Sequence, residues 1–154
     1  MKRTSIPLLI GVGVFLTLAV FIVVRGFYGH MMAIPATVSL PMWAVAVLCG
    51  GLAWKVYSAK KDKSFGIGLD TSQLNPLTVA QFLVVGKAAA WTGTIVGSAY
   101  LGIALYVCPR VGELASASND SVGVASAVLG GLAMAVAGVV LERHCEVPPP
   151  SDTA

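Results

Sequence analysis

The chain has 154 residues, of which 56% are hydrophobic and 11% are charged. An ordinary soluble domain has about 25% charged residues, so this composition excludes a water-soluble fold with a polar surface. The formal net charge is +3, and no basic run is interleaved with aromatic residues, which excludes nucleic acid as a partner. The length is that of one domain, so we expect residues 1–154 to form a single membrane domain.

Four apolar runs are each long enough to cross a bilayer. A hydrocarbon core of about 30 Å requires about 20 apolar residues in a helix. No A-x-A cleavage site follows the first run before Arg25, so we expect an uncleaved span rather than a signal peptide. The predicted fold class is all-α, a polytopic membrane protein with four transmembrane helices. These helices are expected at about residues 6–24, 40–57, 77–107 and 122–141.

The third run is too long for one hydrocarbon core. Asn75-Pro76 is a typical helix start, and the helical pattern continues to Val107. At 1.5 Å per residue this helix is about 48 Å long. We therefore expect residues 88–107 to span the membrane and the preceding turns to lie near its surface. The polar, proline-rich residues 142–154 predict a flexible cytoplasmic tail.

The distribution of lysine and arginine predicts the orientation of the helices. Cytoplasmic loops carry an excess of these residues. Seven lie at the N-terminus, in the second loop and in the C-terminal tail, against two, Arg25 and Arg110, in the other loops. This predicts both termini in the cytoplasm (N-in/C-in) of a multi-pass protein of the cell (plasma) membrane. The seven are Lys2, Arg3, Lys55, Lys60, Lys61, Lys63 and Arg143.

Small residues recur every four positions on the last two predicted helices. Such rows let the backbones of two membrane helices approach closely. Single Gly or Ala pairs are common in membrane helices, but four positions in one register are less easily accidental. We therefore expect close packing between the third and fourth helices, or between copies of the chain. The residues concerned are Gly93, Gly97, Gly123, Ala127, Gly131 and Ala135.

Lys87 is the only charged residue inside an apolar run, so it is the candidate ligand-binding residue. If it lies near the surface, its ammonium group can reach the headgroups along its own stem. If it lies deeper, an anionic headgroup or solute is its natural partner. No Asp or Glu lies within the four predicted spans, which weakens any hypothesis of proton or cation transport.

No cluster of residues indicates catalysis, a cofactor or a metal. Membrane enzymes need several reactive groups at one depth, whereas His30 and His144 are expected on opposite sides of the membrane. His144-Cys145 could resemble metal ligands, but two adjacent residues do not make a tetrahedral site. We therefore predict that the protein is not an enzyme and has neither a metal site nor a cofactor.

Two stretches resemble an uncharacterised actinobacterial membrane protein family, a domain of unknown function. Asn75-Pro76-Leu77-Thr78-Val79-Ala80, continued by Gly86-Lys87-Ala88-Ala89-Ala90, is similar to that family's P-L-x-A-A-R and A-K-A patterns. The ending Leu141-Glu142-Arg143-His144-Cys145 is similar to its L-E-R-W-C ending, although His144 replaces Trp and Gln81 replaces Arg. The resemblance implies four helices, no assigned activity and genes often found beside folate-biosynthesis genes.

These observations favour a non-enzymatic integral membrane protein that acts through helix packing. Its role would be that of an accessory subunit or a small homo-oligomer, with membrane lipids and another membrane protein, or a second copy, as partners. The alternative is a small carrier for an anionic solute or lipid, with Lys87 as the binding charge. Four helices are few for a carrier, so this alternative requires at least a dimer.

Overall fold

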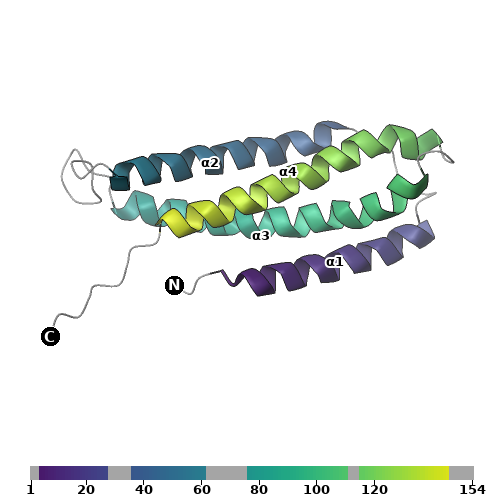
Figure 1. Ribbon diagram of the computed structural model, residues 1–154, viewed down its shortest axis with the longest axis horizontal. Coiled ribbons are helices and arrows are strands. Elements are labelled where there is room, and N and C mark those ends of the chain that lie inside the picture. The colour runs from purple at the N-terminus through teal and green to yellow at the C-terminus, as the bar shows by residue number, and fades with distance from the viewer. Residues whose placement is uncertain (1–3, 28–35, 62–75, 111–114, 146–154) are drawn as a thin grey trace.

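A computed structural model of the chain describes residues 4–27, 36–61, 76–110 and 115–145. Within these residues it is all-helical, as predicted. The long helices are α1 (Ile6–Phe27), α2 (Leu40–Lys61), α3 (Pro76–Val107) and α4 (Ala115–Cys145) (Figure 1). Two single turns of 3-10 helix, η2 (Ala36–Ser39) and η3 (Cys108–Arg110), precede α2 and follow α3.

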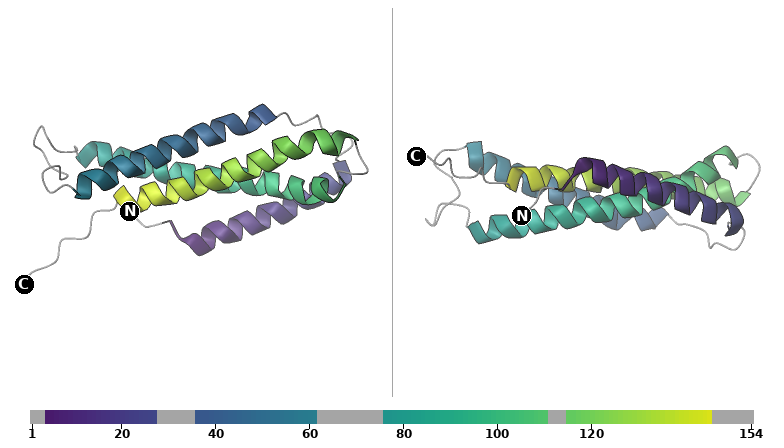
Figure 2. Two further views of the ribbon diagram at one scale, coloured as in Figure 1. Left: turned by 45° about the horizontal axis from the view of Figure 1, so that its top comes forward. Right: turned by 90° about the horizontal axis from the view of Figure 1, so that it is seen from below.

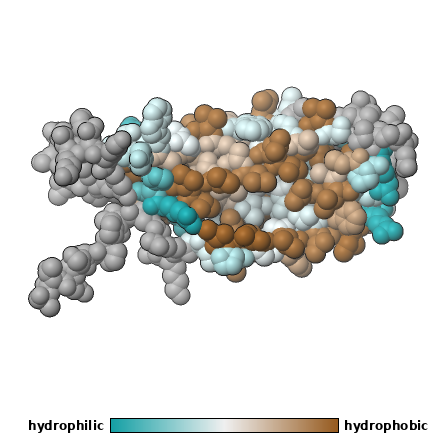
Figure 3. Space-filling view, viewed as in Figure 1, coloured by the Kyte–Doolittle hydropathy of each residue, from teal (hydrophilic) through white to brown (hydrophobic). Residues whose placement is uncertain are grey.

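All four long helices have the length and hydropathy of membrane spans, which confirms the predicted number. On the face shown in Figure 3, hydrophobic side chains form a broad band over the middle of the bundle, and hydrophilic side chains lie towards its two ends. Because α1 and α3 run in one direction and α2 and α4 run back, the start of α1 and the end of α4 face the same end (Figure 1).

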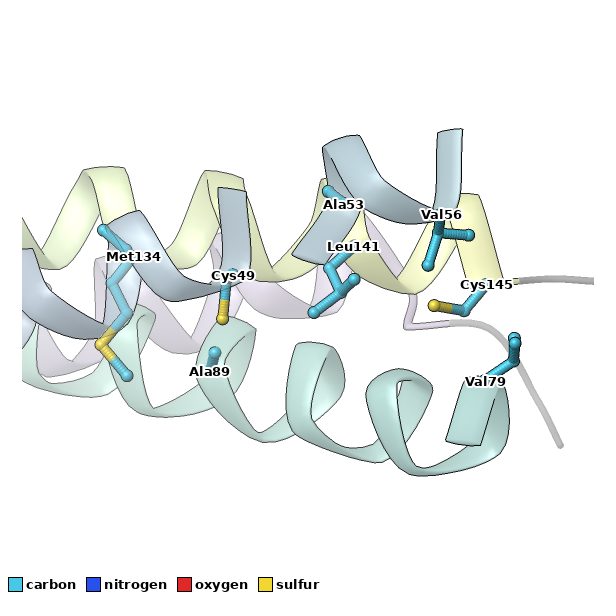
Figure 4. Close-up of a cluster of buried hydrophobic side chains, with 9 residues drawn as sticks. Cys49, Ala53, Val56, Val79, Ala89, Met134, Leu141 and Cys145 are labelled. Carbon is cyan, nitrogen blue, oxygen red and sulfur yellow. The ribbon is translucent and has the colours of Figure 1, made fainter. Parts of the chain in front are cut away.

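The helices are arranged around a central pair, α3 and α4. Among the described residues, α1 packs on α3 and on no other long helix, whereas α2 packs mainly on α4. Figure 2 shows α1 and α2 on different sides of the α3–α4 pair. A cluster of buried side chains fills the space between α2, α3 and α4, and its members include Val56, Val79, Met134, Leu141 and Cys145 (Figure 4).

Three helices extend beyond their predicted bounds, because α1 ends at Phe27, α2 ends at Lys61 and α4 begins at Ala115. α3 is uninterrupted over 32 residues; the depth of its two parts in a membrane stays a prediction. α4 continues to Cys145, four residues beyond the predicted end, so residues 142–145 belong to the helix and not to a flexible tail. The physical reason is burial: Glu142 and Cys145 are 4% and 3% exposed against neighbouring helices. The rest of the expected tail, residues 146–154, lies outside the described residues.

Glycines bring the backbones of α3 and α4 into direct contact. A Cβ atom added to Gly131 would lie 2.5 Å from Cα of Gly97, and one added to Gly93 would lie 2.6 Å from the backbone nitrogen of Ala135. One turn further, a Cβ on Gly138 would lie 2.6 Å from the carbonyl oxygen of Gly86. Each distance is below van der Waals contact, so any side chain at these positions would force the helices apart.

We predict that Gly131→Ala destabilises the isolated protein, whereas Gly11→Ala does not. The added methyl group at position 131 overlaps backbone atoms that cannot move away alone, and overpacking of this kind costs about 1–3 kcal/mol or more. At Gly11 the same methyl group meets nothing within 4 Å. The thermal midpoint of each variant in detergent measures the effect; equal midpoints would contradict the assignment of this contact.

Candidate functional site

The predicted packing residues lie together only in part. Gly93, Gly97, Gly131 and Ala135 meet where α3 and α4 touch. Gly123 and Ala127 are buried nearer the start of α4, and Ala127 is completely inaccessible. The small-residue faces of α3 and α4 therefore contact each other within one chain.

A second close contact joins α1 to α3, and the sequence analysis missed it. The Thr17 hydroxyl donates to the carbonyl oxygen of Ser98 across the helices at 3.1 Å. A Cβ on Gly102 would lie 2.7 Å from the carbonyl oxygen of Thr17, and one on Gly13 would lie 3.4 Å from Cγ2 of Thr94. The sequence does contain the matching pattern of small and hydroxyl residues at a spacing of four, as Gly13-x-x-x-Thr17 on α1 and as Thr94, Ser98 and Gly102 on α3. The α1 pattern has only two members and lies in a strongly apolar run, so it did not stand out.

An apolar groove of about 460 Å³ lies between α1 and α4, with α3 as its floor. We call it the α1–α4 groove. Gly93 and Gly97 form part of its floor and have no side chain to fill it. None of the described residues that line the groove is charged. Its walls include Leu9, Val14 and Leu18 of α1 and Val128, Leu132 and Ala135 of α4.

The hydroxyl groups in the groove are already engaged with backbone carbonyls. Thr17 donates to Gly13 and Ser98, at 2.9 and 3.1 Å. Thr94 donates to the carbonyl of Ala90 at 2.8 Å, and Ser98 donates to that of Thr94 at 2.5 Å. Since each hydroxyl has one proton to donate, these hydroxyl groups have no further proton to offer to a polar ligand.

Glu142 is a buried carboxylate at the end of α4. Its Oε1 accepts a hydrogen bond of 2.8 Å from the backbone N–H of Thr4, which ties the segment before α1 to α4. Its Oε2 has no hydrogen-bond partner among the described residues, nor has the Thr4 hydroxyl. Lys2 and Arg3 precede Thr4 in the sequence and lie outside the described residues. Sequence reasoning placed Glu142 in the tail, because its partner is 138 residues away.

Lys87 does not belong to the α1–α4 groove. It is half-buried on α3, next to Gly86, at which an added Cβ would lie 2.9 Å from the backbone nitrogen of Glu142. The lysine is therefore close to the end of the bundle where α1 starts and α4 ends. The residues that line the groove and the candidate binding charge are not brought together.

The histidine and the cysteines that the structure describes have structural surroundings. The imidazole of His144 packs edge-on against Tyr57 at 5.6 Å between ring centroids, and its Nδ1 lies 2.7 Å from the carbonyl oxygen of Val140. Cys49 and Cys145 are buried and Cys108 is exposed, all as free thiols. Within the described residues, no group of three or more His, Cys, Asp or Glu side chains could hold a metal ion.

One glycine pair faces away from the bundle. Gly50 and Gly51 of α2 are exposed, and an added Cβ at either position would meet nothing within 4 Å. Large apolar side chains surround the pair on α2, where Val47 is 70%, Leu48 64% and Trp54 74% exposed. Unlike the glycines that pack in the bundle, this pair has no backbone against it in the described part of the chain.

We predict that the Thr4–Glu142 hydrogen bond protects the Thr4 amide from hydrogen exchange. Glu142→Leu removes the acceptor, whereas Glu142→Gln retains a side-chain oxygen at the same place. A hydrogen bond to a charged acceptor is worth about 1.5–3 kcal/mol, so exchange at Thr4 should accelerate roughly ten- to a hundredfold in the leucine variant, since 1.4 kcal/mol is tenfold. Equal exchange in wild type and Glu142→Leu would show that the contact is not formed.

The comparisons identify a family and add no activity. Neither the curated proteins nor the solved structures gave a match. A family described as "Protein of unknown function (DUF3180)" matches residues 9–149, a range that includes α2, α3, α4 and all but the first turn of α1. The motifs at the start of α3 and at the end of α4 had predicted a family of unknown function. The chain belongs to this family.

Proposed function

We infer that the chain is a non-enzymatic integral membrane protein that acts through packing against another transmembrane helix. It would serve as an accessory subunit or as a small homo-oligomer. The observation that carries this proposal is the exposed pair Gly50 and Gly51 on α2. Between membrane helices, close approach at small residues is a main source of association, and this pair offers a surface for such an approach.

The contrast with the other glycines supports this function. Gly86, Gly93, Gly97, Gly131 and Gly138 each meet a neighbouring helix backbone inside the chain. They show that glycines of the central helices α3 and α4 lie where another backbone comes close, whereas Gly11 and Gly26 of α1 are open. Gly50 and Gly51 would allow the same close backbone contact if a helix from another chain packed along α2.

The proposal includes an orientation and a location. The seven-to-two distribution of Lys and Arg supports a plasma-membrane protein with both termini in the cytoplasm. The start of α1 and the end of α4 lie at one end of the bundle, which agrees with an even number of spans. The resemblance of the motifs supports an actinobacterial origin, with a gene near folate-biosynthesis genes.

The alternative function, a carrier for an anionic solute or lipid, rests on Lys87. Lys87 is half-buried on α3, which favours a role beyond that of setting the orientation of the chain in the membrane. A carrier also needs a path that includes its binding charge, and Lys87 does not line the α1–α4 groove. Packing against another helix therefore has the stronger support.

We predict that Gly50→Leu and Gly51→Leu weaken association about tenfold or more, which corresponds to about 1.4 kcal/mol. The leucine side chains would keep a partner backbone at a distance, but their Cβ atoms meet nothing within 4 Å in the isolated chain, so its thermal midpoint should not fall. Energy transfer between two labelled copies in vesicles measures self-association. Stoichiometric co-purification of one defined protein measures the accessory role.

The control for this experiment is Gly11→Leu, because Gly11 is also exposed and open but lies on α1. It should leave association unchanged. If the α2 variants affect neither self-association nor co-purification, α2 is not the contact face and the proposed function fails.

We predict the topology from fusions to alkaline phosphatase, which is active only outside the cytoplasm. A fusion after Ala154 should be inactive, and a fusion within residues 111–114, between α3 and α4, should be active. A fusion within residues 62–75, which include Lys63, should also be inactive. Activity of the C-terminal fusion would show that the orientation is opposite to the predicted one, with the fold unchanged.

A further inference from the structure

The α1–α4 groove exists because two helices dock on adjacent rows of α3. α4 packs on the row that includes Gly93 and Gly97, and α1 packs on the row that starts one residue later, at Thr94 and Ser98. One residue corresponds to about 100° around a helix of 3.6 residues per turn. Among the described residues, α1 and α4 make no helix–helix contact with each other.

This angle fixes the width of the opening. If α1 and α4 each lie about 8 Å from the axis of α3, an angle of 100° places their own axes about 12 Å apart, beyond the 8–10 Å of packed helices. The space between them must then be filled by side chains or by another molecule. Gly13 on α1 and Ala135 on α4 contribute almost no side chain there, so the space remains open.

The chemistry of the groove selects an apolar occupant. Its lining has no charged residue, and the protons of its hydroxyl groups are used within the protein. A polar ligand would lose hydrogen bonds on entering such a site, which is costly in an apolar medium. A hydrocarbon chain has no hydrogen bonds to lose and would gain dispersion contacts along three helices.

The size of the groove distinguishes a hydrocarbon chain from a helix. On α1 the groove extends from Leu9 to Leu18, which is about 13 Å at 1.5 Å per residue. Its volume of about 460 Å³ lies within the range of about 300–1,000 Å³ that small-molecule sites have. A helix of the same length, with a diameter of 10–12 Å, occupies about 1,000 Å³ or more. An extended hydrocarbon chain, with carbon contacts at about 4 Å, has a cross-section of roughly 20 Å² and occupies less than a third of that volume.

We propose that the α1–α4 groove binds the acyl chain of a membrane phospholipid. The chain lies along α3 between Val14 of α1 and Leu132 of α4 and completes the packing between these two helices. No hydrophobic gain accompanies its transfer from the bilayer, since the bilayer is equally apolar. The lipid is held because an empty groove would leave its lining without contacts on one side.

A lipid held in this way stays with the protein when bulk lipid is removed. The protein is reconstituted in vesicles of phosphatidylcholine and phosphatidylglycerol that contain a phospholipid with a photoreactive diazirine in its acyl chain. It is then extracted in mild detergent, freed of excess lipid and illuminated. We expect about one lipid per chain, with crosslinks at Val14, Leu18 and Leu132 and fewer than one fifth as many at Phe15 and Leu129, which are exposed but outside the groove.

Matched tryptophan variants separate the groove from the outer surface. Leu132→Trp places a large side chain in the groove, and Leu129→Trp places the same side chain on α4 outside it; these residues are 57% and 60% exposed. Val14→Trp and Phe15→Trp form the corresponding pair on α1. Each groove variant should retain at least fivefold less lipid than its control, at an unchanged helical content.

Three outcomes would overturn the proposal. Wild-type protein could retain no lipid after extraction, the crosslinks could be as frequent at Phe15 and Leu129 as in the groove, or the groove variants could retain as much lipid as their controls. Loss of a stoichiometric protein in Leu132→Trp, with lipid retention unchanged, would assign the groove to a partner helix instead. The test is independent of α2, so its failure leaves the proposed role of Gly50 and Gly51 untouched.

Discussion

The direct backbone contact between α3 and α4 is the constraint on which the rest of the structure depends. In a bilayer the lipid tails are as apolar as leucine side chains, so the hydrophobic effect does not hold helices together. Dispersion contacts must do so, and they fall off within about 1 Å of the optimum. Gly93, Gly97 and Gly131 bring whole stretches of backbone to that optimum, which larger residues would prevent.

This central pair determines where the outer helices can lie. The glycine row of α3 is occupied by α4, so α1 uses the next row, where Thr17 bonds to the backbone of Ser98. α2 packs on the side of α4, where Trp43 lies 3.1 Å from the position of a Gly130 Cβ and Ser39 hydrogen-bonds to Ser126 at 2.8 Å. The outer helices therefore leave large parts of their own surfaces to the membrane.

The sequence predicted the number of spans well, because the length and hydropathy of a run depend on that run alone. It predicted the contact of α3 with α4 from residue spacing, since close packing in membranes leaves small residues at every fourth position. The α1–α3 contact was missed because its α1 side is one glycine and one threonine in a strongly apolar helix. Whether a short row of small residues forms a helix–helix contact depends on the helix that packs against it, and the spacing of the row does not reveal which helix that is.

The candidate sites were harder to predict because they depend on residues that are distant in sequence. Glu142 marks the end of the apolar run, and charge alone placed it in a tail. Its burial results from the backbone N–H of Thr4 and from the close approach of α3 at Gly86. The α1–α4 groove likewise has no motif of its own; it follows from the angle between two rows on α3, which becomes visible only when both partners are known.

The two proposed binding surfaces differ in shape, and this difference determines what each can hold. Gly50 and Gly51 lie on the outer, convex side of α2, where a second helix can lie along its length and approach the backbone. The α1–α4 groove is concave, and its volume of about 460 Å³ is smaller than that of a helix of the same length. A flexible chain can follow such a groove, whereas a helix could insert only single side chains. Contacts with proteins on α2 and with lipid beside α1 therefore do not compete for the same surface.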